Sequence, residues 1–167
     1  MPHLLQVVDP LKGRQTTTVL NAPRSHIRTI LLATDLSPVS NGASNEAVGL
    51  CRALGARMLI LNVIDIRQGL ARNLLQGSRA TRLDQLRAER ERQMVGTVED
   101  ARRGGVDTAF LVWTGEPGQS IVSAAEAEGA DLVVVGTRAL DRAGRFLLGS
   151  VSDYVVNHST CPVLIAR

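Results

Sequence analysis

Residues 131–137 read Asp-Leu-Val-Val-Val-Gly-Thr, and this stretch decides the fold. The run from Leu132 to Val135 has no polar side chain on either face, so other parts of the chain must cover both sides of the strand. Strands of this kind are typical of parallel sheets that carry helices on each face. The sequence therefore predicts an α/β domain built around this strand.

Strand and helix patterns alternate around this stretch. Short apolar runs indicate strands at 30–33, 58–64, 106–113, 131–135 and 161–166, and three- or four-residue apolar spacing indicates helices at 40–54, within 67–103, at 118–128 and at 150–158. Strands joined through helices require parallel crossovers, which are almost always right-handed. We predict a single doubly wound, Rossmann-like α/β domain at residues 26–167, with a five-stranded parallel sheet and helices on both faces. Residues 1–25 are predicted to form a loosely ordered N-terminal extension.

The composition favours a soluble, cytoplasmic protein. The 167 residues are the size of one domain. Cys51 and Cys161 belong to no CxxC or Cys/His cluster, which argues against a disulfide scaffold or a zinc site and favours a reducing compartment. The apolar pieces near the N-terminus are short and are interrupted by Asp9, Pro10 and Lys12, which argues against a signal peptide or a membrane span.

The charge pattern argues against a nucleic-acid partner. The 19 basic and 16 acidic side chains leave a net charge of only +3. Aromatic residues make up 2% of the chain and are scattered, whereas single-strand binders stack bases on aromatic rings. The arginine-rich segment 67–103 also carries acidic residues at helical spacing, such as Glu91 after Arg87. It is therefore predicted to be a solvated helix face, with a partner surface as the less favoured interpretation.

Two segments are predicted to meet at the carboxyl edge of the sheet. Residues 33–35 (Ala-Thr-Asp) follow the first strand of the domain, and a glycine-punctuated loop at 136–149 follows the valine-rich strand. Ligands of open parallel sheets bind at this edge, where the strand order reverses. Glycine lets the backbone approach a ligand, and the free N–H groups of a helix that Ser150 caps favour an anion such as phosphate.

Simpler interpretations stand beside this one. Gly136 and Gly149 serve only as turns, and Ser150 only as a cap, if no ligand binds. Asp35 is equally suited to cap the following turn. Cys51 lies on the apolar helix stripe, which favours a small buried side chain. The histidines have no spacing for a metal or a triad, and no P-loop or positioned general base is evident, so we predict a binding protein without catalysis.

Five segments match one known family in the same order: Ile30–Ser37, Leu61–Asp65, Gly115–Pro117 with Ile121, Asp131–Thr137 and Cys161–Ile165. They resemble the universal stress proteins. The resemblance covers nearly the whole domain and implies the family's fold, which is similar to that of adenine nucleotide alpha hydrolases. It also implies a stress-response protein that binds or senses an adenine nucleotide.

The resemblance implies which residues would hold the nucleotide. ATP-binding members carry the motif G-x2-G-x9-G-[ST], which Gly136, Gly149 and Ser150 fit, but Ala139 stands in place of the middle glycine. A methyl group there would cost on the order of 1 kcal/mol if the turn requires a positive φ. Asp141 opposes a phosphate, and neighbouring arginines offset it. The residues implied for ATP or another adenine nucleotide, with Mg²⁺ only alongside it, are Ala33, Thr34, Asp35, Val63, Val135, Gly136, Arg138, Ala139, Gly149, Ser150 and Val151.

The surroundings of the base and the last strand complete the expectations. The adenine is expected to lie against Val63 and Val135, because no aromatic ring is seen in these strand-end segments. In the family the last strand pairs with its copy, so the resemblance implies a homodimer through Val163, Leu164 and Ile165. No membrane partner is expected, and the downstream protein partner is unknown. The alternative is a protein-interaction module that binds no ATP, and an adenylating enzyme is the least favoured hypothesis.

Overall fold

The computed structural model describes residues 5–8, 15–18, 27–65, 79–137 and 148–166. Strands and helices alternate through the domain. They are β3 (Thr29–Ala33), the short helix η1 (Pro38–Ser40), α1 (Asn41–Leu54), β4 (Arg57–Asp65), α3 (Arg79–Arg103), β5 (Thr108–Gly115), α4 (Pro117–Ala127), β6 (Leu132–Gly136), α5 (Ser150–His158) and β7 (Val163–Ala166). Among the described residues no helix is long and apolar enough to span a membrane.

The sheet is parallel throughout, with the strand order β5-β4-β3-β6-β7. The chain first adds strands on one side of β3 and then returns to add β6 and β7 on the other side. The direction of winding therefore reverses between β3 and β6. This topology confirms the predicted doubly wound, five-stranded α/β domain.

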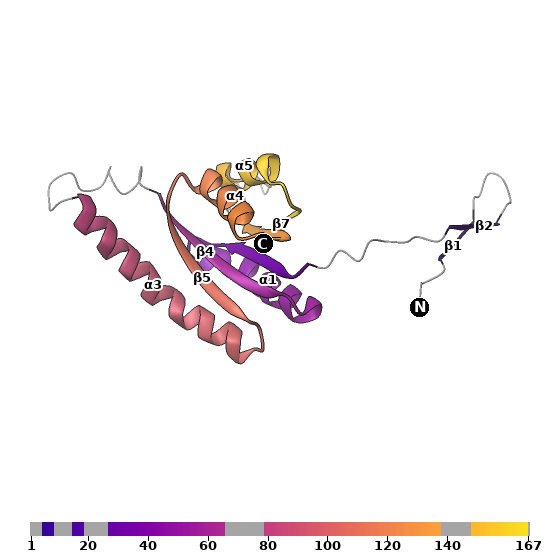
Figure 1. Cartoon of the computed structure of the whole chain (residues 1–167), viewed down its shortest axis with the longest axis horizontal. Helices are drawn as coiled ribbons and strands as arrows, with labels where there is room; N and C mark the ends of the chain where they lie inside the picture. Colours follow the sequence, from indigo (N-terminus) through magenta and orange to yellow (C-terminus); the bar gives the residue numbers. More distant parts are fainter. Residues whose placement is uncertain (1–4, 9–14, 19–26, 66–78, 138–147, 167) are drawn as a thin grey trace.

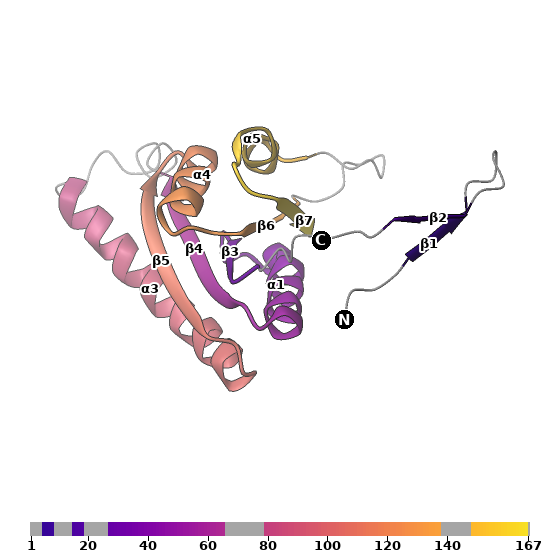
Figure 2. The same cartoon turned by 45° about the vertical axis from the view of Figure 1, so that its right-hand side comes forward.

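Helices cover both faces of the sheet, as Figures 1 and 2 show. α1 and the C-terminal half of α3 pack on one face, where Met94, Val98 and Ala101 contribute to the buried cluster. α4 and α5 pack on the other face through Ile121 and Val155 among others. Opposite winding directions place the two helix pairs on opposite faces because every crossover has the same hand.

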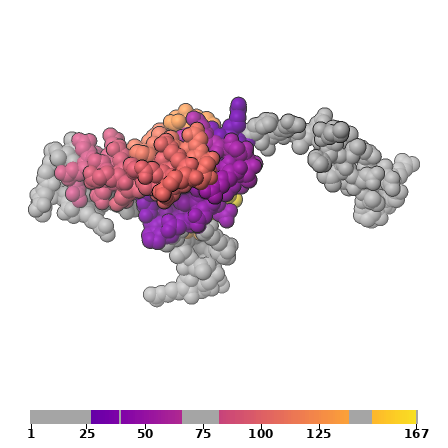
Figure 3. Space-filling model, turned by 90° about the horizontal axis from the view of Figure 1, so that it is seen from below, coloured from indigo at the N-terminus to yellow at the C-terminus, as the bar shows by residue number. Residues whose placement is uncertain are grey.

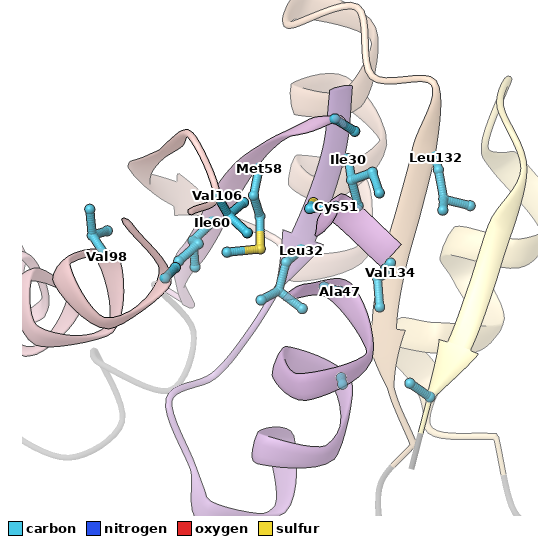
Figure 4. Packing of buried hydrophobic residues seen from close by; sticks show 14 of the residues in the cluster. Ile30, Leu32, Ala47, Cys51, Met58, Ile60, Val98, Val106, Leu132 and Val134 are labelled. Atoms are coloured by element: carbon cyan, nitrogen blue, oxygen red, sulfur yellow. The ribbon is translucent and has the colours of Figure 1, made fainter. Parts of the chain in front are cut away.

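The core beneath α1 explains the buried cysteine. Figure 4 shows Leu32, Met58 and Val134 of three adjacent strands on the side of the sheet that carries Ala47 and Cys51. All five are at most 2% exposed. Burial raises the pKa of the Cys51 thiol to about 11, so Cys51 is neutral at physiological pH and is the small buried side chain that the apolar stripe predicts.

Helix ends follow local chemistry. Gly55 ends α1 in the left-handed conformation, with φ 65°, which glycine adopts without the steric cost of a side chain. Pro117 opens α4, and the carboxylate of Glu116 accepts a hydrogen bond from the backbone N–H of Gln119 at 2.7 Å.

The N-terminal segment differs from the sequence prediction, whereas the start of α3 lies within the predicted range 67–103. β1 (Leu5–Val8) pairs antiparallel with β2 (Gln15–Thr18), a two-stranded ribbon that the expected loose extension did not include. α3 begins at Arg79, and the residues between Asp65 and Arg79 lie outside the described part of the chain. The N-terminal part of α3 reaches beyond the body of the domain, as Figure 3 shows.

Candidate functional site

The carboxyl ends of β3 and β6 lie side by side at the reversal of strand order. Ala33 is paired with Val135 on one side and with Leu61 on the other. The chain leaves β3 with the Thr34 N–H bonded to the Leu61 carbonyl at 3.0 Å. The structure therefore places residues 33–35 beside Gly136, the described start of the second segment that the sequence assigns to this site.

The N–H, hydroxyl and carbonyl groups of Thr34 all make hydrogen bonds within the protein. Its hydroxyl lies 2.8 Å from the Ser40 hydroxyl and accepts the Leu36 N–H at 3.0 Å. Its carbonyl accepts a hydrogen bond from the Asn62 side chain at 2.9 Å. The Ser40 hydroxyl in turn donates to the Ser37 carbonyl at 2.7 Å. The role of Thr34 is thus to hold the loop between β3 and α1 in one conformation.

Asp35 takes the capping role that was one of its two interpretations. Its carboxylate accepts the Ser37 N–H at 3.0 Å, two residues along the chain, and its side chain is exposed. Leu36 follows with φ 62°, an uncommon conformation for a residue with a side chain. The loop is therefore strained at Leu36 and is held by the hydrogen bonds on each side of it.

Gly136 ends β6 and contacts both neighbouring helices. Its carbonyl accepts the Ser152 hydroxyl of α5 at 2.9 Å. A methyl group on Gly136 would lie 3.7 Å from the Ala43 side chain and 4.0 Å from the Ser40 Cα, which are ordinary contacts. The described packing therefore leaves room for a side chain at this position.

α5 begins at Ser150, as the sequence predicts, but its N-cap differs from the predicted one. Gly149 is the N-cap, with φ −65° and ψ 153°, and Ser150 is the first helical residue, so the prediction that Ser150 caps the helix is wrong. Among the described residues no side chain caps this end, and Asp153 lies in the first turn. Because the N-cap residue has no side chain, the first N–H groups of α5 have no cap of their own and are available to an anion.

Val63 has an aromatic neighbour that the sequence pattern did not show. The register between β4 and β5 pairs Val63 with Trp113, and both pack against the buried cluster beneath α4. The premise that no aromatic ring lies near Val63 is therefore wrong, since its partner on the neighbouring strand is Trp113. The register between β4 and β5 determines which residues are neighbours across the two strands, and the spacing of residues along one strand does not reveal that register.

Asn62 and Ser152 are the site residues that sequence reasoning missed. Asn62 is 3% exposed and Ser152 is 4% exposed, and each uses its side chain to hold a backbone carbonyl at a strand end. A lone amide inside the apolar run 58–64 was the available signal for Asn62. Ser152 gives no such signal, because serine within a helix is common.

Some of the remaining residues predicted to bind the nucleotide lie in the described part of the chain, and others lie outside it. Val151 is half-buried against the cluster under α4 and α5, and Val135 lies in the same cluster. Arg138 and Ala139 lie outside the described residues, as does Asp141. Within the described part of the chain, no three His, Cys, Asp or Glu side chains group as metal ligands would.

Comparison with known proteins agrees with this architecture. Residues 26–167 match the model of the universal stress protein family. A universal stress protein of Thermus aquaticus, from the 3′ region of a sulfhydrylase, is 36% identical over 141 residues, which span 84% of this chain and 98% of the relative.

Two solved structures carry nucleotides. A universal stress protein in complex with cAMP is 26% identical and superposes with a TM-score of 0.61, covering 84% of this chain and 97% of its own. A universal stress protein of Archaeoglobus fulgidus in complex with dAMP is 19% identical, with a TM-score of 0.61 and coverage of 84% and 98%.

Proposed function

This chain belongs to the universal stress protein family, and from that premise we propose that it binds an adenine nucleotide at the ends of β3 and β6, in the crevice that open α/β sheets form where the strand order reverses. The observation that carries the proposal is the meeting of the two predicted segments at the reversal of strand order. Relatives with the same fold have been solved with cAMP and with dAMP. The shared chemistry of those ligands is an adenine base and a phosphate.

Each half of such a ligand has a suitable part of the crevice. The uncapped N–H groups at the start of α5, held beside Gly136 by Ser152, suit the phosphates. The exposed carboxylate of Asp35 and the backbone of Val63 suit the adenosine, and Trp113 adds apolar surface beside Val63. Mg²⁺ would accompany only a bound polyphosphate, whose oxygens are its preferred ligands.

The proposed role is a stress-response binding or sensing module without catalysis. The described residues of the crevice supply hydrogen-bond donors and apolar walls, and any hydrolysis of ATP is expected to be slow. Both cysteines are free thiols, which supports a reducing, cytoplasmic setting.

We propose further that the protein is a homodimer through β7. This strand pairs with β6 alone in the sheet order, and its described residues carry no charge that would discourage pairing with a second strand. Val163, Leu164 and Ile165 are half-buried in the single chain. A two-fold axis beside β7 would extend the sheet into the second copy.

The competing function is a protein-interaction module that binds no nucleotide. Ala139 favours it, because alanine stands where the motif has its middle glycine. Calorimetric titration of AMP, cAMP and ATP into the purified protein separates the two functions, and Ala139→Gly provides the matched variant. Binding by the unmodified chain supports the proposal. Binding only after Ala139→Gly, or in neither protein, would favour the interaction module.

A further inference from the structure

Asn62 is a buried polar residue in an otherwise apolar strand. Its amide nitrogen donates to the Thr34 carbonyl at 2.9 Å, and its side-chain oxygen is buried and has no hydrogen-bond partner in the described structure. Exchanging the amide oxygen and nitrogen would set two acceptors against each other, so the donor must face Thr34. Asn62 thus makes one hydrogen bond and leaves one acceptor unmet.

This arrangement is a poor choice for stability. A buried acceptor without a partner loses its hydration and regains nothing, and an apolar side chain avoids that loss. Asn62 lies on the same face of β4 as Met58 and Ile60, whose side chains are at most 1% exposed. Packing therefore favours an apolar residue at this position, and stability does not explain the asparagine.

The Thr34 carbonyl that Asn62 holds belongs to the peptide between Thr34 and Asp35. This peptide is planar, so fixing the carbonyl also fixes the Asp35 N–H, which points away from Asn62. The next residue is Leu36, whose φ of 62° is strained. Without the Asn62 hydrogen bond, the chain after β3 has one fewer constraint exactly where it departs from ordinary backbone geometry.

We propose that Asn62 is a positioning residue that holds the Thr34–Asp35 peptide in the orientation that receives the adenosine half of the nucleotide. This inference rests on the proposed function, because it assigns Asn62 to the same crevice. The amide costs stability and supplies a preorganised loop, a trade that binding sites commonly make. The phosphate half, at Gly136 and the start of α5, does not depend on Asn62.

The test replaces Asn62 with valine. Valine is close in size, suits a strand, and avoids placing a methyl group 2.9 Å from the Thr34 oxygen, as leucine would. We expect the affinity for AMP to fall about tenfold while the affinity for tripolyphosphate stays within twofold. The unfolding midpoint in urea should stay nearly the same, because removal of the unmet Asn62 oxygen offsets the loss of a hydrogen-bond partner for the Thr34 carbonyl. A merely structural role predicts instead a lower midpoint and equal losses for both ligands, and that result would overturn the inference.

Two further variants and a hydrogen-exchange measurement keep the test decisive. Thr108→Val removes another buried side-chain hydrogen bond, from the Thr108 hydroxyl to the Val106 carbonyl at 3.0 Å, at the opposite end of the sheet. It should leave AMP binding unchanged. Asn62→Ala repeats the loss of the donor without added bulk if the valine variant does not fold.

Hydrogen exchange in the nucleotide-free protein reports on the loop itself. The Leu36 and Ser40 amides, which bond within the loop, should exchange faster in both Asn62 variants. If the unmodified protein binds no AMP while these amides still exchange faster in the variants, the proposed function fails and the positioning role stands. If their exchange is unchanged, the positioning role is wrong.

Discussion

The Ser152 hydroxyl of α5 donates a hydrogen bond to the Gly136 carbonyl at the end of β6, at 2.9 Å. Sixteen residues separate the two along the chain, and most of the intervening loop lies outside the described residues. The hydrogen bond fixes the distance between a strand end and the first turn of the helix. The two proposed phosphate-binding elements therefore keep their relative position independently of the loop that joins them.

Ser152→Ala tests whether this hydrogen bond holds α5 beside β6. Ser152 is 4% exposed, so loss of the hydrogen bond leaves the Gly136 carbonyl short of a partner and should lower the free energy of unfolding by about 1–2 kcal/mol. Nucleotide affinity should fall as well, because α5 is no longer held beside β6. Urea unfolding and calorimetry measure the two effects. Ser123→Ala on the exposed side of α4 is the control. Equal effects from both variants would contradict a role for the Ser152–Gly136 hydrogen bond in positioning α5.

Ser150→Pro tests whether the first N–H of α5 binds phosphate. Proline is well tolerated at the first helical position, and Gly149 already has the extended backbone that proline requires of its predecessor. We expect the free energy of unfolding to change by less than about 0.5 kcal/mol. ATP affinity should fall several-fold because one amide donor is gone.

Ser150→Ala keeps that amide and serves as the control for the side chain. If Ser150→Pro binds ATP as tightly as Ser150→Ala, the first N–H of α5 is not part of the site.

The fold was predictable because its determinants are local, whereas part of the site was not. Apolar runs and the glycine at position 55 mark the strands and a helix end, and strand ends then locate the crevice. Asn62 and Ser152 act through contacts between elements distant in sequence. Trp113 approaches Val63 only through the register of two strands. Such contacts depend on tertiary geometry, which residue spacing does not encode.

The close approach of α4 and α5 depends on Gly118. A methyl group there would lie 2.9 Å from three carbon atoms of Tyr154, closer than side chains tolerate. Gly118→Ala should therefore lower the free energy of unfolding by about 1–3 kcal/mol. Gly49→Ala in the middle of α1 is the matched control, because no atom lies within 4 Å of the added carbon.

That control should raise the free energy of unfolding by about 0.5–1 kcal/mol, since alanine favours a helix interior over glycine. Thermal unfolding of both variants gives the comparison. Destabilisation by both, or by neither, would show that the Gly118 contact with Tyr154 does not limit the packing of the two helices.

The hydrogen bonds between the Asp131 carboxylate and the start of β3 make the stability of the protein depend on pH in the acid range. Its carboxylate accepts the N–H groups of Arg28 and Thr29 at 2.8 and 3.0 Å, and these hydrogen bonds lower its pKa. A lowered folded-state pKa stabilises the protein above the unfolded value of about 4. The contribution is lost as pH falls through the lower folded value.

Asp131→Asn should thus lower stability at pH 7 and weaken the pH dependence below about pH 4. Urea unfolding between pH 2.5 and 7 measures this difference, with Asp84→Asn on the exposed face of α3 as the control. If the stability of Asp131→Asn falls with decreasing pH as steeply as that of the unmodified protein, the Asp131 carboxylate does not contribute to acid stability.

Ile165→Pro tests the proposed dimer through β7. The Pro162 carbonyl accepts the N–H of Val133 in β6, and the Ala166 carbonyl accepts the N–H of Thr137, which directly follows β6. Backbone groups alternate in direction along a strand. The Val163 and Ile165 N–H groups therefore point toward the open edge, and the Leu164 N–H points toward β6. Proline at an edge position removes a donor without breaking the existing ladder.

We expect Ile165→Pro to sediment as a monomer at concentrations where the unmodified protein sediments as a dimer, with a small loss of stability. Leu164→Pro removes a donor on the inner side of the same strand and should instead destabilise the domain, because it interrupts the pairing with β6. The opposite effects of two neighbouring prolines follow only if the outer edge of β7 carries the second copy. A dimer that persists in a folded Ile165→Pro variant places the interface elsewhere on the domain.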